Sequence, residues 1–173
     1  MYQRALQGYE KARGPEHTST LTTVGNMGRV LQKRCYAAAK FSSRNIVLAY
    51  IKQVASLCIR FPHSRFTLFD YVRRAFAWVG DNEMSAVAFA HQLALSSSEY
   101  NASCDSCNTR LCVESSRLVC TVCEDMDLCK RCFDKLESNG LGEISFSCQG
   151  HKFLGLNGAS IVRSSSTDNA TQW

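Results

Sequence analysis

The hydrophobic pattern divides the chain into a helical first half and a second part without that periodicity. Through most of residues 1–95, apolar side chains recur at helical spacing, and turn signals such as Gly14-Pro15 separate the runs. We expect five helices, over the stretches 1–14, 17–35, 43–60, 66–80 and 82–95. The last two are expected to form a helix–turn–helix hairpin around Gly80.

Three of the expected helices have an apolar face, and that of the first helix comprises Leu6, Tyr9 and Ala12. The face of the second helix, for which Thr18 or Ser19 is the expected N-cap, comprises Leu21, Val24, Met27, Val30 and Leu31. The face of the fourth helix comprises Leu68, Tyr71, Val72, Ala75, Phe76 and Val79. The aromatic side chains of this region are expected in the core rather than in a ligand cage: Phe66, Phe69, Phe76, Trp78 and Phe89. Gly25 and Gly28 each cost roughly 1 kcal/mol of helix stability relative to alanine, which indicates close packing against a neighbour.

The first two helices carry a family resemblance. The stretch "MYQRALQGYEKARGPEHTSTLTTVGNMG", within about residues 1–32, resembles the fungal kinesin-light-chain type of tetratricopeptide repeat. In that family the first piece is the second helix of one repeat, and the piece after "GPEHTST" opens the next. The resemblance implies tetratricopeptide-like helical hairpins over 1–95 and a chain that begins in mid-repeat. Either the chain is part of a longer array, or the later helices cover the free face, because such repeats bury their core by stacking.

The second part of the chain is rich in cysteine. Eight of the ten cysteines lie between Cys104 and Cys148, while Cys35 and Cys58 stand alone upstream. The N-terminus lacks the apolar segment of a signal peptide, and no apolar window is long enough for a membrane span. We therefore expect an intracellular protein, cytoplasmic or nuclear, whose cysteines bind metal rather than form disulfides. A polar linker precedes a metal-binding domain at 100–156, and a small, polar tail at 157–173 is expected to be disordered.

Charge also differs between the two parts. Residues 1–100 carry a net charge of +7 and residues 101–173 a net charge of −2. If seven cysteines bind two zinc ions as thiolates, the second part falls to −5. Nucleic-acid binding by this part is disfavoured, because positive charge supplies most of the affinity for a phosphate backbone. The basic residues upstream are spread out, and a solvated helix face explains them more simply than a nucleic-acid patch.

The candidate ligands form four pairs of equal spacing: Cys104/Cys107, Cys120/Cys123, Cys129/Cys132 and Cys148/His151. Two intervening residues allow a tight turn to point both ligand atoms at one ion while backbone N–H groups bind the thiolates. Eight such ligands suit two tetrahedral zinc ions. Sites with four protein ligands have no open position, so they are structural, and Glu124 beside a ligand finds no metal-bound water to activate. We expect no enzyme.

This spacing resembles the ZZ-type zinc finger. The residues that carry the resemblance are "CDSCNTRLCVESSRLVCTVCEDMDLCKRCF", within about 100–154. The resemblance implies a small cross-braced finger with short β-strands. One zinc would be held by Cys104, Cys107, Cys129 and Cys132, and the other by Cys120, Cys123, Cys148 and His151. ZZ fingers usually end in two histidines, so Cys148 departs from the pattern. RING and LIM fingers fit worse, because they need a histidine earlier in the ligand series. Cys112 has no partner and is expected to be a semi-buried residue of the finger.

Some ZZ fingers bind the free N-terminus of a partner peptide. The positions that match the peptide-binding residues are Asp105, Asn108, Asp125 and Asp127. Carboxylates suit this role because they accept charge-assisted hydrogen bonds from an ammonium group, although Asp127 could instead bond to the backbone and orient the fold. The leading interpretation is a non-enzymatic, zinc-binding interaction module with a protein or peptide partner and no membrane partner. The alternatives are a ubiquitin-ligase-type zinc module and, less favoured, nucleic-acid binding.

Overall fold

The computed structural model describes residues 1–95, 102–111, 117–138, 148, 150–156 and 161–162, and the chain divides into two compact units. The helical unit spans Met1–Asn101 and the cysteine-rich unit spans Ala102–Trp173. Their boundary falls at the end of the polar linker that the sequence indicates. The described residues are mainly helical, with short antiparallel strands in the second unit. None of the described helices is both long and apolar enough to cross a membrane.

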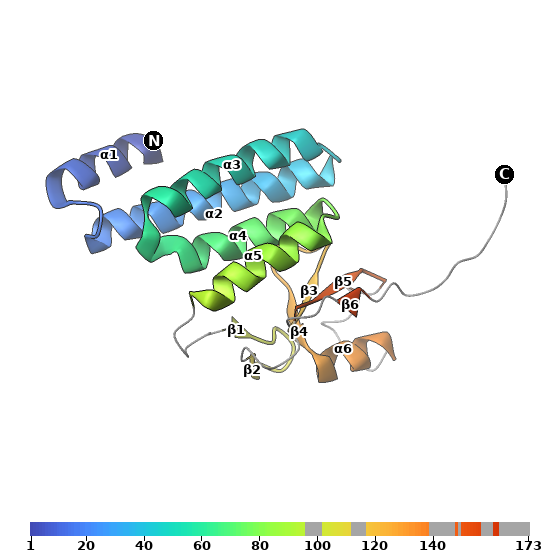
Figure 1. The fold of residues 1–173 in the computed structure, drawn as a ribbon. Helices are drawn as coiled ribbons and strands as arrows, with labels where there is room; N and C mark the ends of the chain where they lie inside the picture. Colours follow the sequence, from blue (N-terminus) through green and yellow to red (C-terminus); the bar gives the residue numbers. More distant parts are fainter. Residues whose placement is uncertain (96–101, 112–116, 139–147, 149, 157–160, 163–173) are drawn as a thin grey trace. The chain divides into compact units, whose positions relative to one another are not determined.

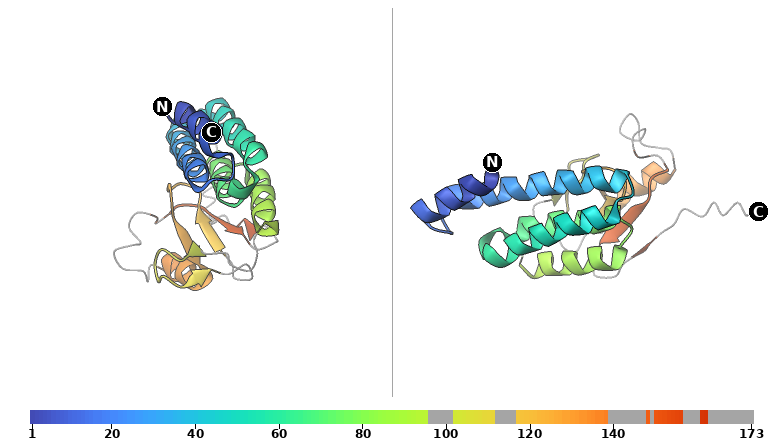
Figure 2. Two further views of the ribbon diagram at one scale, coloured as in Figure 1. Left: turned by 90° about the vertical axis from the view of Figure 1, so that its left-hand side faces the viewer. Right: turned by 90° about the horizontal axis from the view of Figure 1, so that it is seen from above.

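The helical unit is built around a long central helix (Figure 1). Its elements are α1 (Tyr2–Arg13), α2 (Thr18–Lys40), α3 (Arg44–Arg60), a 3₁₀ turn (Pro62–Ser64), α4 (Arg65–Trp78) and α5 (Asn82–Ala94). Helix α2 packs against α1, α3 and α4, and α4 packs against α5. Figure 2 shows α2 and α3 side by side along most of their length.

The helices agree with the sequence analysis in number and in most of their bounds. Helices α1, α3, α4 and α5 begin and end within two residues of the expected stretches. Helix α2 is longer than expected, since it continues to Lys40. The residues beyond Cys35 include three consecutive alanines, 37–39, and alanine is the best helix former. The helical first half is confirmed, while its tetratricopeptide character stays a prediction.

Local sequence signals set the ends of the helices. Gly14 ends α1 with a φ of 87°, and Gly80 turns the chain between α4 and α5 with a φ of 74°, both in the left-handed region that favours glycine. The N-cap of α2 is His17, whose Nδ1 accepts a hydrogen bond from the Ser19 N–H at 3.1 Å. The prediction of Thr18 or Ser19 as this cap is therefore wrong, because an imidazole nitrogen takes the place of the usual hydroxyl.

The predicted apolar faces supply the core of the helical unit. Val24 and Leu31 are buried on α2, and the buried residues of the predicted α4 face are Leu68, Val72, Ala75 and Phe76. The remaining positions of both faces are half-buried. Of the five predicted core aromatics, Phe76 and Phe89 are buried and the other three are half-buried. Helix α1 buries only Leu6, fewer side chains than any of the other four α-helices of this unit.

The two glycines of α2 play different roles. A Cβ built on Gly28 would lie 2.7 Å from Cδ2 of Leu68 and 2.9 Å from Cε2 of Tyr71, both on α4. A Cβ on Gly25 would meet nothing within 4 Å. Gly28 therefore allows the close approach of α2 to α4, as the sequence indicated. The same expectation is wrong for Gly25, because this glycine faces open space.

Helix α4 also carries two buried arginines that its amphipathic pattern did not indicate. Arg73 is fully buried and Arg74 is 4% exposed. Both guanidinium groups bind the carboxylate of Asp70, Arg73 at 2.5 Å and Arg74 at 3.1 Å. In the sequence, acidic and basic residues three and four positions apart are typical of an exposed helix surface. In the structure both guanidinium groups are buried, and both bind the half-buried carboxylate of Asp70.

The cysteine-rich unit combines two small sheets with one helix. A two-stranded hairpin is formed by β1 (Ala102–Ser103) and β2 (Arg110–Leu111). The second sheet has the order β4-β3-β5-β6, with β3 (Arg117–Cys120), β4 (Asp127–Cys129), β5 (Phe153–Leu156) and β6 (Ile161–Val162). Helix α6 (Lys130–Glu137) directly follows β4. All strand pairs are antiparallel.

The apolar core of this second unit is small. Among the described residues, its main cluster contains the large side chains of Leu111, Leu128, Phe133, Leu136 and Phe153 together with four cysteines, and Val119, Leu154 and Leu156 are buried outside that cluster. The rings of Phe133 and Phe153 meet edge to face, with their centres 5.2 Å apart. Residues 161–162, which the sequence assigns to a disordered tail, pair with β5 as strand β6, so the expected disorder does not apply to them. The rest of the predicted tail lies outside the described residues.

Candidate metal centres

The first cysteine pair lies in the turn of the β1–β2 hairpin. The backbone N–H of Asn108 donates to the carbonyl oxygen of Cys104 at 2.8 Å, and the N–H of Cys104 donates to that of Thr109 at 2.9 Å. Asn108 adopts a φ of 55°, a left-handed conformation that asparagine tolerates well. This tight turn brings the sulfur atoms of Cys104 and Cys107 to one side of the hairpin.

The second pair lies where β3 turns towards β4. Cys120 ends β3, and Cys123 lies in the turn. The backbone N–H groups of Val122 and Cys123 donate to the Cys120 sulfur at 3.4 and 3.3 Å. This is the arrangement that the two-residue spacing predicts, and it stabilises a thiolate at Cys120.

The third pair joins β4 to α6. Cys129 is the N-cap of α6, and its sulfur accepts a hydrogen bond from the Cys132 N–H at 3.4 Å. The junction of β4 and α6 thus places a backbone N–H group against the Cys129 sulfur and sets the two cysteines one helical turn apart.

The fourth pair precedes β5. The N–H of His151 donates to the carbonyl oxygen of Cys148 at 3.0 Å, and Gly150 between them has a φ of 77°. The left-handed glycine closes a turn that points both ligand atoms the same way. Cys148, the departure from the usual ZZ pattern, is buried and lies beside the second pair.

The four pairs assemble into two groups of four. Within the described residues, the side chains that could hold a metal ion are Cys104, Cys107, Cys129 and Cys132 in one group, and Cys120, Cys123, Cys148 and His151 in the other. In each group the ligand atoms lie within 4.8 Å of one another. The first pair joins the third and the second joins the fourth, so the structure brings together the residues that the cross-brace predicts.

Three of the ligand–ligand distances in the two groups fit a tetrahedral ion, and the distance between Cys123 and Cys148 is shorter. Zn–S bonds of about 2.3 Å imply sulfur–sulfur separations of about 3.8 Å, and Zn–N bonds of about 2.0–2.1 Å imply sulfur–nitrogen separations of about 3.5 Å. The sulfur atoms of Cys107 and Cys129 are 3.8 Å apart. Nδ1 of His151 lies 3.5 Å from the sulfur atoms of both Cys120 and Cys123. The Cys123 and Cys148 sulfur atoms are closer, at 3.2 Å.

Burial makes most of these thiols hold their protons in the absence of metal. Desolvation raises the pKa of Cys104 and Cys120, and it raises the pKa of Cys132 to about 12. Cys107 is the exception, since a hydrogen bond with the Thr109 hydroxyl lowers its pKa to about 5. A metal ion entering either group must therefore displace protons, which couples metal binding to pH.

Three residues around these sites were not identified from the sequence. The Thr109 hydroxyl lies 3.1 Å from the Cys107 sulfur, and a hydrogen bond with Cys107 raises the pKa of Arg131. Arg117 is buried on β3 and forms an ion pair with Asp127 on β4. Strand register could have identified Arg117. Val119 pairs with Asp127 across the sheet, and Arg117, two residues before Val119 on the same strand, lies on the same face of the sheet as Val119.

The four residues proposed for peptide binding have different environments. Asp125 and Asn108 are exposed. Asp105 is exposed, and its carboxylate accepts the Asp127 N–H at 2.5 Å. Asp127 is 5% exposed and is paired with Arg117, which matches the alternative in which Asp127 orients the fold. Their contact with a peptide stays a prediction.

The remaining cysteines lie outside both groups. Cys35 and Cys58 are buried in the core of the helical unit. Burial raises the pKa of Cys35 to about 12 and that of Cys58 to about 11. The prediction for Cys112 falls outside the described residues.

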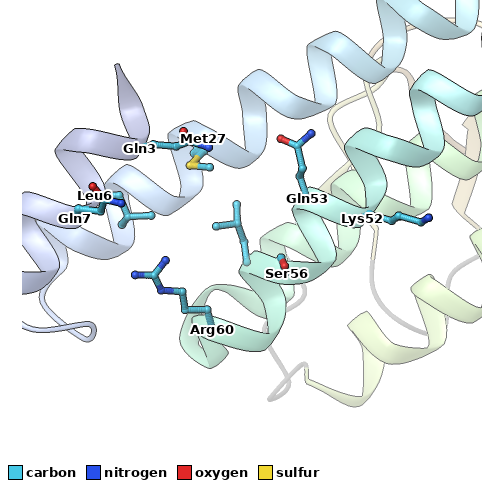
Figure 3. Close-up of a pocket in the computed structure, with 9 residues that line it drawn as sticks. Gln3, Leu6, Gln7, Met27, Lys52, Gln53, Ser56 and Arg60 are labelled. Carbon is cyan, nitrogen blue, oxygen red and sulfur yellow. The ribbon is translucent and has the colours of Figure 1, made fainter.

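The helical unit has a groove of about 570 Å³ between α1, α2 and α3 (Figure 3). Its apolar lining comprises Leu6, Met27 and Leu57, and its polar lining comprises Gln3, Gln7, Lys52, Gln53, Ser56 and Arg60. One wall is fixed by the ion pair of Arg60 with Glu10. The groove contains none of the metal-binding or peptide-binding candidates.

Comparisons with known proteins give no relative. No protein-family model matches the sequence, and no curated protein and no solved structure is significantly similar to the chain.

Proposed function

We propose that this protein is a zinc-binding, non-enzymatic interaction module whose cysteine-rich unit is a ZZ-type finger. The observation that carries the proposal is the interleaving of four ligand pairs into two groups of four. An interleaved arrangement ties the β1–β2 hairpin, the β3–β4 turn, α6 and the segment before β5 together through two ions.

The donor sets favour zinc. Four sulfurs in one group, and three sulfurs with one imidazole in the other, are typical of tetrahedral structural zinc sites. When bound, zinc supplies cross-links that a small apolar core cannot replace. Each ion would have all four positions filled by side chains, so the sites support a structural role.

The interaction role rests on the surface beside the first group. Asp125 and Asn108 are exposed, and the carboxylate of Asp105 lies in the same hairpin as Cys104 and Cys107. An exposed carboxylate beside a rigid metal site suits a protonated peptide N-terminus. Of the four predicted residues, Asp127 is the weakest candidate for this contact, because it is buried against Arg117.

The zinc content per chain tests the metal assignment. We expect about two zinc ions per chain, and we expect Cys148→Ser to lose or weaken one of them. Cys58→Ala, a change at a buried cysteine outside both groups, is the control and should keep both ions. Elemental analysis of the purified proteins gives the count. A wild-type protein with a single ion would contradict the cross-braced arrangement.

Peptides with free and acetylated N-termini test the interaction role. A peptide library displayed with free N-termini should contain binders, and acetylation should abolish their binding because it removes the ammonium charge. Asp125→Asn should weaken binding, whereas Asp134→Asn on the exposed side of α6 should not. Equal binding of free and acetylated peptides, or no binding of either, would rule out N-terminus recognition and leave the zinc assignment intact.

A further inference from the structure

A long stretch of the helical unit has no acidic residue. Between Glu16 and Asp70 the chain has eight lysines and arginines and no aspartate or glutamate. This stretch contains the whole of α2 and α3. Exposed helix faces of ordinary proteins usually mix both signs of charge, because opposite charges at i and i+4 stabilise the helix. The solvated-face explanation does not account for the complete absence of acidic residues here.

Three of these cations form a stripe on α2, which we call the basic stripe: Arg29, Lys33 and Lys40. At 100° per residue, they lie within about 40° of one another around the helix axis. All three are exposed, and the stripe lies opposite the buried face of α2 that contains Val24 and Leu31. The basic stripe therefore forms a continuous cationic surface along more than half of the helix.

The basic stripe is not neutralised within the described part of the chain. The acidic side chains of the helical unit that form ion pairs bind other residues: Glu10 binds Arg60, Glu16 binds His63, Asp70 binds Arg73 and Arg74, and Asp81 binds Arg44. Among the described residues, none forms an ion pair with Arg29, Lys33 or Lys40. The positive charge of this face is therefore available to an external partner.

One end of the basic stripe is pre-organised and apolar. The Lys40 ammonium lies 4.4 Å from the centre of the Tyr36 ring, which lies 5.1 Å from the ring of Trp78. A cation held over an aromatic ring loses less conformational freedom on binding. Beyond it, Phe41 is 83% exposed in the α2–α3 turn and Ile46 is 50% exposed. The last cation of the stripe, Lys40, is thus followed directly by the exposed apolar side chain of Phe41.

We infer that the basic stripe and the α2–α3 turn bind an acidic protein segment. Carboxylates repeating along one side of the segment would bind Arg29, Lys33 and Lys40, and an apolar residue at its end would cover Phe41. This surface is in the helical unit, so it is independent of the zinc sites and of the peptide-binding residues proposed for the finger.

Other anionic partners fit this surface less well. A membrane-binding helix has apolar side chains along its length, whereas Thr22, Asn26 and Ala37 accompany the cations of the stripe. A phosphate backbone offers no apolar group for Phe41 and Ile46, and three cations neutralise few phosphates. An acidic segment with an apolar end matches both the stripe and the turn.

A binding assay on the full-length protein tests the inference. The probe is a fluorescein-labelled helical peptide with glutamate at every fourth position and leucines at one end. We expect Arg29→Gln/Lys33→Gln to weaken binding about tenfold at physiological salt, in line with the loss of two ion pairs. Phe41→Ala should weaken it further. The matched control is Arg4→Gln/Lys11→Gln, which removes the same charge from exposed positions of α1 and should have little effect.

Two results would overturn the inference. If the control pair weakens binding as much as the stripe pair, the attraction comes from net charge and not from this surface. If a single-stranded RNA or phosphatidylserine vesicles bind more tightly than the peptide and depend on Arg29 and Lys33, the partner is a different class of molecule. Circular dichroism of each variant verifies that the helices are intact, since all four altered cations are solvent-exposed.

Discussion

The two units bury cysteine for opposite reasons. In the helical unit, Cys35 and Cys58 lie among apolar side chains and fill space in the core. In the cysteine-rich unit, ligand sulfurs converge on one another until pairs such as Cys107 and Cys129 are 3.8 Å apart. A thiol packed among hydrocarbons stabilises a fold as a small apolar side chain. A cluster of converging thiols can instead hold an ion at its centre, which binds the sulfurs as thiolates and links the segments that carry them.

This difference implies different sources of stability. The helical unit has a continuous core that runs from Leu6 on α1 to Ala88 on α5. In the described part of the cysteine-rich unit, the apolar cluster around the ligands has five large side chains, and the strands are two to four residues long. Sheets of this size are at best marginally stable alone. The comparison teaches that one chain can combine a unit folded by apolar burial with a unit folded by metal.

Metal removal should produce the largest difference in stability between the two units. A chelator should unfold the cysteine-rich unit and leave the helical unit folded, because structural zinc contributes on the order of 10 kcal/mol per site in small zinc domains. Two-dimensional NMR spectra recorded before and after chelation would show the loss of dispersed signals from one unit only. Simultaneous loss of signals from residues of α2 and α4 would contradict the assignment of stability to separate sources.

Thiol alkylation at neutral pH is the matched control for this experiment. Burial raises the pKa of Cys35 to about 12 and that of Cys58 to about 11. At pH 7 both thiols therefore stay protonated and unreactive, since the thiolate is the nucleophile. Mass spectrometry should find them unlabelled with or without chelator, while Cys120 and Cys123 become labelled only after metal removal.

Substitution of Asp70 is expected to have the next largest effect on stability, and it tests how far the ion pairs of α4 stabilise the helical unit. Asp70→Ala should destabilise the protein by about 3–5 kcal/mol, because it removes the carboxylate that binds the fully buried guanidinium of Arg73. Thermal denaturation followed at a helix wavelength measures this change. The control is Glu10→Ala, which removes the exposed ion pair with Arg60 and should cost less than about 1 kcal/mol.

The helical fold could be predicted where one signal dominates. Amphipathic periodicity and the breakers Gly14, Gly80 and Pro62 located the helices to within two residues, except at the end of α2. The buried position of Arg73 could not be predicted, because charge at i+3 from Asp70 is equally typical of a solvated surface. A buried and a solvated Arg73 are distinguished only by the packing of α5 against α4, which places the centre of the Phe89 ring 6.0 Å from the Arg73 guanidinium.

The ligand residues could be predicted because metal geometry restricts their spacing. Four pairs with two intervening residues indicate metal sites from local sequence alone. Which pair joins which came only from the family resemblance, and the structure groups them in the same way. Two residues that support the sites could not be found from a short motif. Thr109 reaches Cys107 through the geometry of the turn, and Arg117 reaches Asp127 through strand register.

The smallest expected effect concerns the two glycines of α2, and it tests whether the helical unit depends on close packing. Gly28→Ala should destabilise the protein by about 1–3 kcal/mol, because its Cβ would overlap Leu68 and Tyr71. Gly25→Ala should stabilise it by up to about 1 kcal/mol, because alanine is the better helix former and the Cβ meets open space. Chemical denaturation measures the free energy of unfolding of the two variants, which have the same amino-acid composition. If both variants change the free energy of unfolding equally and with the same sign, the close contact of α2 with α4 at Gly28 does not stabilise the helical unit.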